Sequence, residues 1–285
     1  MSEQSARWRD LGTRVLSAVV LVAITLAALW SGPVAWDIFV FAVFGLMIYE
    51  LARLCDPEIS FARRVALGVV PLAYPLLAIA GIVLGDDRLI EDLPPGITGQ
   101  GLFEGGIYGA VMGVAAPLIV GLVMLGRGRL LWLAYGALLC GAVLYLAYDY
   151  NQHGAGGILA IVGLVVVSDS AGYFAGRAFG GPKFWPAISP KKTWSGTVAG
   201  WIGCAIFGAV VLPHFGLTWL EGAVASFVVC FAAQMGDIAE SAMKRRVGLK
   251  DSSSLIPGHG GVLDRLDALV AAACLAGIIT LVSGG

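Results

Sequence analysis

The chain has 285 residues, of which 58% are hydrophobic and only 13% carry a charged side chain, and its mean hydropathy is +0.86. A soluble protein of this length cannot hide so much apolar surface in one core, so the lipid bilayer is the expected solvent for most of the chain. The net charge of −1 gives no electrostatic basis for binding nucleic acid.

Nine apolar segments are long enough to cross a bilayer as an α-helix, which takes about 20 residues. In chain order they are residues 14–31, 35–54, 65–84, 107–125, 130–148, 155–179, 196–214, 221–243 and 262–282. We therefore expect an all-α, polytopic integral membrane protein in which residues 1–285 form a single membrane-embedded domain. The five cysteines are scattered through these apolar runs, which fits buried side chains and not a disulfide or metal framework.

The basic residues predict the orientation of these spans. If the N-terminus is cytoplasmic, Arg88 is the one residue of the 18 Lys and Arg that falls on the outer side. The positive-inside rule favours that arrangement. It places the two long polar loops, residues 180–195 and 244–261, at the cytoplasmic face of what we expect to be a bacterial inner membrane.

Three carboxylates are expected inside or at the ends of the spans. Asp169 lies in the sixth predicted span, Asp237 lies in the eighth, and Asp264 opens the ninth. Acidic residues in a membrane are costly and mark functional sites. Counted from the cytoplasmic ends of their helices, Asp169 and Asp237 should lie on the order of 10 Å deep. We predict that the three converge as ligands of a hard cation beside phosphate groups, with a second cation left open.

Basic residues flank this predicted cluster on its cytoplasmic side. Those expected to contact phosphate groups are Lys191, Lys192, Lys244 and Arg245. Arg246 is expected to be a membrane anchor instead. The glycines of residues 257–261 precede the ninth span, where free backbone N–H groups suit an anion.

Several of these features also have a structural explanation. Asp264 and the nearby Asp267 suit the positive N-terminus of a helix. Glu240 lies one turn before Lys244, which suits an ion pair, and Glu50 is expected to pair with Arg53. The strip formed by Gly172, Gly176 and Gly180 suits helix packing as well as substrate approach.

Residues 241–267 follow the pattern S-x-x-K-R, K-D, P-G-H-G-G and D-R-x-D. This pattern resembles the signature of the phosphatidate cytidylyltransferases, also called CDP-diacylglycerol synthases. Residues 189–194 (S-P-K-K-T-W) and 169–177 (D-x-x-G-Y-x-x-G-R) resemble two further blocks of that family. The resemblance is concentrated in residues 165–270. Family members often carry Glu where this chain has Ser195, so a carboxylate role does not carry over there.

The resemblance implies a Mg²⁺-dependent enzyme that transfers the cytidylyl group of CTP to phosphatidate, giving CDP-diacylglycerol and pyrophosphate at the cytoplasmic face. Membrane lipids are then further partners, and a homodimer is left open. The residues expected to be catalytic are Lys192, Asp237, Lys244 and Asp264. Those expected to bind substrate are Ser189, Lys191, Thr193, Arg245, Lys250, Asp251, His259, Gly260, Arg265 and Asp267.

Three other functions are open at this point. A related enzyme acting on an ether-lipid phosphate would need the same motifs, because contacts with lipid chains leave no readable pattern. An ion-coupled transporter would also need buried carboxylates, but it does not account for the long polar signature. A non-catalytic membrane scaffold gives no reason for Asp169 and Asp237 in a bilayer.

Overall fold

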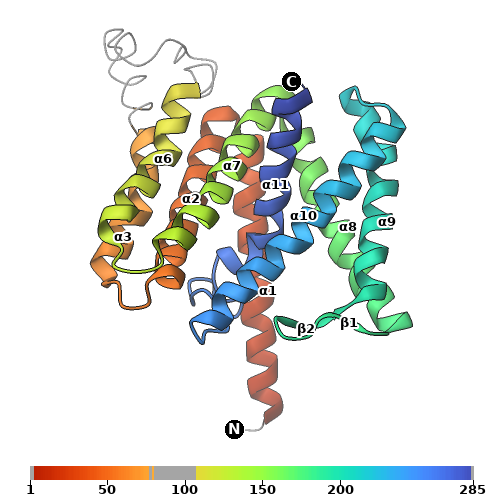
Figure 1. Ribbon diagram of the computed structural model, residues 1–285, viewed down its shortest axis with the longest axis horizontal. Helices are drawn as coiled ribbons and strands as arrows, with labels where there is room; N and C mark the ends of the chain where they lie inside the picture. Colours follow the sequence, from red (N-terminus) through yellow and green to blue (C-terminus); the bar gives the residue numbers. More distant parts are fainter. Residues whose placement is uncertain (1–2, 77–78, 80–106, 284–285) are drawn as a thin grey trace. The chain divides into compact units, whose positions relative to one another are not determined.

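The computed structural model describes residues 3–76, 79 and 107–283, and all the long elements in these ranges are α-helices (Figure 1). The helices are α1 (Glu3–Trp30), α2 (Pro33–Cys55), α3 (Phe61–Val69), α6 (Ile107–Met124), α7 (Arg129–His153), α8 (Ala155–Phe179), α9 (Trp194–Val211), α10 (Trp219–Arg246) and α11 (Leu263–Ser283). Two short 3-10 helices, η1 (Val70–Leu72) and η2 (Leu212–Phe215), interrupt the connections between them. The predicted all-α class is confirmed.

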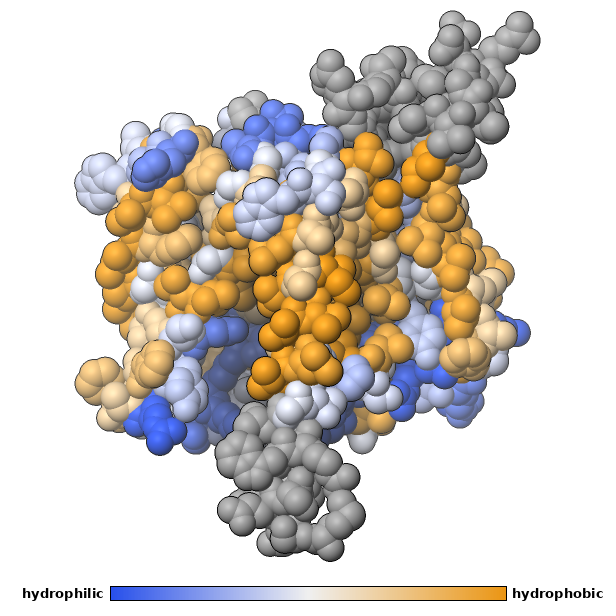
Figure 2. Space-filling model, turned by 180° about the vertical axis from the view of Figure 1, so that it is seen from behind, coloured by the Kyte–Doolittle hydropathy of each residue, from blue (hydrophilic) through white to orange (hydrophobic). Residues whose placement is uncertain are grey.

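Within the described residues, seven helices are long and apolar enough to cross a membrane. They cover Gly12–Trp30, Pro33–Cys55, Arg129–His153, Ala155–Phe179, Trp194–Phe215, Trp219–Arg246 and Leu263–Ser283. Large apolar side chains such as Leu16, Val210 and Val282 are exposed on their surfaces, and Figure 2 shows apolar residues over much of the helices that it displays. Such extensive apolar exposure is suited to lipid, so the chain is a polytopic membrane protein.

The other two predicted spans are described less completely. Residues 65–84 lie partly outside the described residues, and in the described part α3 gives way to η1, which contains Pro71. Proline cannot donate a backbone hydrogen bond, which favours this break. The predicted span at 107–125 matches α6, whose Gly113–Met124 part is apolar. Arg88 lies outside the described residues, and the cytoplasmic N-terminus stays a prediction.

The chain divides into two compact units, and the predicted single domain stays a prediction. The first unit comprises Met1–Gly136 and Leu249–Arg265. Within it α2 packs closely against α3, because a Cβ added at Gly45 would lie only 2.2 Å from the carbonyl oxygen of Gly68. Glycine is therefore required where these two helices cross.

The second unit comprises Ala137–Gly248 and Leu266–Gly285, and α8, α9 and α10 pack together in it. A Cβ added at Gly196 of α9 would lie 2.5 Å from the carbonyl oxygen of Gly172 in α8. A Cβ added at Gly222 of α10 would lie 2.4 Å from the carbonyl oxygen of Gly208. The glycine strip of α8 thus serves helix packing, at least at Gly172.

A short antiparallel hairpin links α8 to α9. Its strands are β1 (Lys183–Trp185) and β2 (Ser189–Thr193), and Lys183 pairs with Thr193. Thr193 then begins α9 as its N-cap, because its hydroxyl accepts a hydrogen bond from the Gly196 N–H at 3.3 Å. The sequence predicted a loop here, and the hairpin instead gives Lys191 and Lys192 a defined backbone.

Candidate active site

Lys192 and Asp237 form an ion pair in the second unit. The Lys192 Nζ lies 2.5 Å from Asp237 Oδ2, and the two side chains are 27% and 32% exposed. The Ser241 hydroxyl donates to the other Asp237 oxygen at 3.5 Å, along the helix face that the sequence predicted. The hairpin and α10 therefore bring together two of the residues expected to be catalytic.

Asp169 belongs to the same group of charges. It lies on α8, and the charges of both Lys192 and Asp237 act on its carboxylate. Asp169 and Lys192 line one cavity of about 470 Å³. The predicted clustering of Asp169 with Asp237 and basic residues is consistent with this arrangement.

The lining of this cavity is strongly cationic. Its charged residues are Asp169, Arg177, Lys183, Lys191 and Lys192. The other lining residues are small or polar and are Ser168, Gly172, Tyr173, Gly176, Thr193, Gly196, Thr197 and Gln234. A lining with four cationic side chains and one carboxylate suits a ligand with several negative charges, such as a polyphosphate.

Asp267 lies beside Asp237, although the sequence placed it among the substrate-binding residues. The two carboxylates interact electrostatically, and the Ala268 N–H donates to Asp267 Oδ1 at 2.8 Å. A close crossing of α10 and α11 brings them together, since a Cβ at Gly236 would lie 2.7 Å from the Asp267 carbonyl oxygen. Two adjacent carboxylates repel one another unless a cation or a proton lies between them.

Lys244 forms an ion pair with Glu240 one turn earlier on α10. Glu240 is fully buried and the Lys244 side chain is only 13% exposed. The structural explanation of Glu240 is therefore confirmed. A contact between Lys244 and phosphate stays a prediction, and Arg245 and Arg246 are both exposed.

Asp264 lies in the first unit, together with residues 249–262, which we call the signature loop. One oxygen, Oδ2, is within hydrogen-bonding distance of the Gly261 N–H at 2.7 Å, the Ser252 N–H at 2.9 Å and the Ser252 hydroxyl at 3.1 Å. The expected helix N-terminal role is thus observed. The other oxygen lies 3.1 Å from the Ser252 N–H, and metal binding by Asp264 stays a prediction.

The remaining predicted residues of the signature loop are held in an ordered turn. The carbonyl oxygen of His259 accepts from the Arg265 side chain at 2.6 and 2.9 Å. The ring Nδ1 of His259 lies 2.9 Å from the Ser17 hydroxyl. Gly260 has a φ of +87°, and a Cβ there would lie 2.8 Å from Asp264 Oδ2. Lys250 and Asp251 are exposed. Substrate binding by these residues stays a prediction.

In the hairpin, Thr193 is buried and caps α9, while Ser189 pairs with Trp185 at the other end. The Ser195 hydroxyl donates to the Gly180 carbonyl and so ties the start of α9 to the end of α8. At the position where the related family often has Glu, this chain therefore has a local structural contact.

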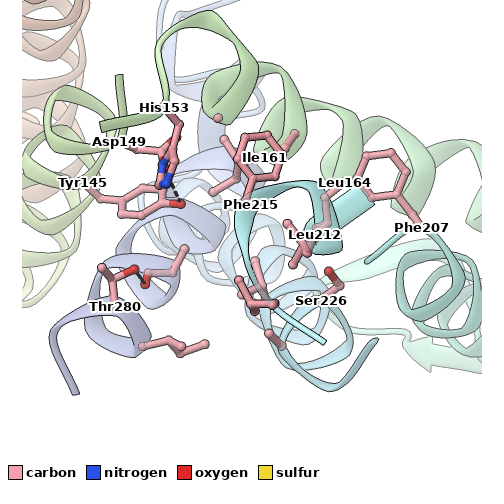
Figure 3. A pocket seen from close by; sticks show the side chains of 17 residues that line it. Tyr145, Asp149, His153, Ile161, Leu164, Phe207, Leu212, Phe215, Ser226 and Thr280 are labelled. Atoms are coloured by element: carbon pink, nitrogen blue, oxygen red, sulfur yellow. Dashed lines mark hydrogen bonds and ion pairs between the residues drawn. The ribbon is translucent and has the colours of Figure 1, made fainter. Parts of the chain in front are cut away.

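A different cavity in the second unit, of about 170 Å³, has a contrasting character (Figure 3). Its lining is largely apolar, with Ile161, Leu164 and Phe215 among the residues. Asp149 is buried there and pairs at 2.9 Å with Nδ1 of His153, an exposed residue at the end of α7. A cavity of this chemistry does not suit a polyphosphate.

Three residues were missed by the sequence analysis. Arg177 and Lys183 line the cationic cavity. Arg177 ends the D-x-x-G-Y-x-x-G-R block, so its motif was a usable signal, whereas Lys183 needed the strand pairing. Glu50 accepts hydrogen bonds from the signature loop, and no local pattern indicated that contact.

Comparison with known proteins agrees with these motifs. The model of a family described as the cytidylyltransferase family matches residues 12–282. A phosphatidate cytidylyltransferase of Brucella suis is 36% identical over 270 residues, covering 93% of this chain and 92% of the relative. One of Haemophilus influenzae is 34% identical over 284 residues, covering 92% and 96%. One of Mycobacterium leprae is 40% identical over 129 residues, covering 45% and 41%.

Proposed function

Because the chain belongs to the cytidylyltransferase family, we propose that its cationic cavity binds CTP for transfer of the cytidylyl group to phosphatidate. The chain is a nucleotidyltransferase of phospholipid synthesis, embedded in a membrane. The assignment of the site rests on the Lys192–Asp237 ion pair, because Lys192 also lines the cationic cavity. The pair joins the 189–194 block on the hairpin to a carboxylate of α10, close before the 241–267 block begins.

The reaction forms one phosphorus–oxygen bond and breaks another. A phosphate oxygen of phosphatidate attacks the α-phosphorus of CTP, and pyrophosphate leaves with the electrons of the broken bond. The protein must align two polyanions and offset their repulsion. Lys191, Lys192 and Arg177 are placed to do this, because their side chains line the same cavity.

The acidic residues of the second unit fit a Mg²⁺ ion. Within the described residues no group of three or more His, Cys, Asp or Glu side chains is arranged as a complete metal cage. Mg²⁺ is commonly held by one or two carboxylates plus substrate phosphates, so a complete cage is not required. Asp237 would hold the ion, together with Asp169 or Asp267, whose charges act on Asp237.

A bound Mg²⁺ ion would neutralise charge on the triphosphate and on the pyrophosphate as it leaves. Asp264 remains a proposed ligand through Oδ1, because its Oδ2 already lies near three donors. The cytoplasmic face of a bacterial inner membrane is the proposed location, since CTP is cytoplasmic and the lipid substrate can enter from the side. A homodimer stays untested.

The direct test is an assay of the purified protein in detergent–phosphatidate mixed micelles. With CTP labelled in the α-phosphate, the label should move into lipid only when phosphatidate and Mg²⁺ are both present. With CTP labelled in the γ-phosphate, it should appear in pyrophosphate. Release of γ-label without any lipid product would reject the proposal in favour of CTP hydrolysis.

An ether-linked lipid phosphate is the alternative substrate. The cationic cavity recognises the phosphate groups, and no described contact selects the lipid chains. Both lipids should therefore be assayed at equal surface concentration. A higher kcat/KM for the ether lipid would transfer the assignment to that substrate and keep the same chemistry.

A further inference from the structure

Glu50 of α2 is fully buried, and both of its carboxylate oxygens face the signature loop. Oε1 accepts from the Val262 N–H at 3.0 Å and from the Ser253 hydroxyl at 2.5 Å. Oε2 accepts from the Leu263 N–H at 2.7 Å and is 3.1 Å from the Ser252 hydroxyl. All four contacts lie within the first unit.

Four donors surround this one carboxylate, and one of them, the Ser252 hydroxyl, is shared with Asp264. Each oxygen has about two lone-pair positions, and each has two donors here. A carboxylate buried in a membrane-spanning helix is costly unless its oxygens are satisfied in this way. With its accepting positions occupied, Glu50 has none left for a metal ion or for a substrate hydroxyl.

The donors also mark what Glu50 organises. Val262 and Leu263 stand at the start of α11, where backbone N–H groups are not used within the helix. A carboxylate there acts as a capping group supplied by a distant part of the chain. Gly261 must be glycine, because a Cβ would lie 2.5 Å from Glu50 Oε1 and 2.0 Å from the Ser252 hydroxyl.

Ser252 connects Glu50 to Asp264. Its hydroxyl lies 3.1 Å from an oxygen of each carboxylate, so its single proton links the two. The Ser252 N–H and the Gly261 N–H fix the Asp264 carboxylate directly. The orientation of Asp264 therefore depends on a loop that Glu50 holds.

We propose that Glu50 is a positioning residue of the enzyme, which holds the signature loop and the start of α11 so that Asp264 keeps its orientation. This inference rests on the proposed function of that loop. It gives α2, which contains none of the three sequence blocks quoted above, a specific task in the reaction. Arg53, one turn further along α2, supports the same task, since its Nη1 is 3.5 Å from the Ser252 carbonyl oxygen.

The test variant is Glu50→Gln, which keeps the size of the side chain. Its amide nitrogen replaces one accepting oxygen with a donor, so it faces a backbone N–H or a hydroxyl unfavourably. We expect kcat to fall about 10- to 100-fold, as is usual when groups that orient a site are lost. Ser253→Ala removes one donor of the four and should cause a smaller loss.

A second readout follows the loop itself. A spin label on Ser254→Cys, an exposed loop position, is introduced into a protein without its native cysteines. Glu50→Gln should increase the mobility of that label while thermal unfolding in detergent still shows a folded protein. The matched control is Glu58→Gln, because Glu58 is exposed in the same unit and pairs with Arg127. It should change neither activity nor label mobility.

The outcomes separate this inference from the proposed function. Unchanged kcat and unchanged label mobility in Glu50→Gln would overturn it. So would a loss of activity that merely matches the unfolded fraction, since that would make Glu50 a general stability residue. If the wild type transfers no cytidylyl group, the proposed function fails, and the label mobility still decides whether Glu50 holds the loop.

Discussion

The Lys192–Asp237 pair is weak enough to exchange partners. Both side chains are about a third exposed, so the ion pair has only modest strength. If a triphosphate binds in the cavity as proposed, Lys192 would gain a more highly charged partner, and Asp237 would be free to hold a cation. A weak, half-buried pair therefore suits a site that must change partners during a reaction.

Replacing Lys192 tests whether it exchanges Asp237 for the triphosphate of CTP. Lys192→Met keeps most of the side-chain length and removes the charge. A charge-assisted hydrogen bond contributes about 1.5–3 kcal/mol, so kcat/KM for CTP should fall about 10- to 100-fold. Initial rates over a range of CTP concentrations measure the change.

The control for this variant is Arg246→Ala. Arg246 is exposed at the end of α10 and lies in the expected anchor region. Its kcat/KM should remain within about 2-fold of the wild type, as for most surface substitutions. Equal losses in both variants would assign Lys192 to the general positive charge of the surface instead of to CTP.

The sequence predicted which residues belong to the candidate site, but it predicted only some of the side-chain contacts that they make. Asp237 and Lys192 could be assigned to one site from the sequence, because Asp237 is an acidic residue near the cytoplasmic end of a predicted span and Lys192 belongs to the 189–194 block. The partners of Glu50 could not, because the Ser252 hydroxyl is 202 positions away in the chain. The expected Glu50–Arg53 pair followed helix spacing, whereas both residues contact the signature loop.

At the scale of elements, close helix crossings place the hairpin. Gly172 and Gly176 of α8 face the start of α9, where a Cβ on Gly176 would lie 2.9 Å from the Thr193 hydroxyl. The same two glycines line the cationic cavity. The packing explanation of the glycine strip therefore holds there, and substrate approach stays a prediction that open space beside these small residues would allow.

Gly196→Ala tests this crossing. The new methyl would lie 2.5 Å from the Gly172 carbonyl oxygen, and backbone cannot move aside as easily as a side chain. Overpacking of this kind costs about 1–3 kcal/mol, which exceeds the gain in helix propensity of about 1 kcal/mol. The unfolding temperature in detergent should therefore fall, and activity should fall with it as the hairpin moves.

Gly203→Ala is the matched control on the same helix. A Cβ there would meet only the side chains of Ala171 and Val167, at 3.3 Å. The unfolding temperature should stay near that of the wild type. If Gly196→Ala is as stable as Gly203→Ala, the close approach of α8 and α9 is not needed for the fold.

The elements differed in how far the sequence predicted them. Long apolar segments gave seven described spans close to their expected positions, because length and hydropathy together determine what can cross a bilayer. The hairpin was not predicted, since β1 and β2 have three and five residues and Pro190 interrupts the polar sequence of β2. Strands this short have no periodic apolar signal.

At the scale of the whole molecule, the orientation in the membrane is the main prediction. A cytoplasmic N-terminus and nine spans put the C-terminal end of α11 outside and the signature loop inside. Single cysteines at Ser283 and Ser254, both exposed, are introduced into a protein without native cysteines. An impermeant thiol reagent applied to intact cells should label Ser283→Cys and leave Ser254→Cys unlabelled.

Inverted vesicles provide the control, because the accessible face is exchanged. There Ser254→Cys should react and Ser283→Cys should not. The opposite pattern in both preparations would place the signature loop on the side without CTP, and the proposed orientation would be wrong. Labelling of both positions from one side would indicate that α11, the one helix between them, does not cross the membrane.

The central claim is that Asp237 supports Mg²⁺-dependent cytidylyl transfer to a lipid phosphate. Its most direct test is the rate of α-label transfer from CTP to phosphatidate across a range of Mg²⁺ concentrations. The proteins compared are wild type, Asp237→Asn and Glu221→Gln. Glu221 is the matched control because it lies on the same helix in a capping box with Thr218, which Gln can also complete.

Asp237→Asn should remain folded and lose on the order of 100-fold or more in kcat, because asparagine keeps the size of the side chain but not its charge. Added Mg²⁺ should not restore the rate, and Glu221→Gln should match the wild type. A rate for Asp237→Asn close to that of the wild type at limiting Mg²⁺ would contradict the account.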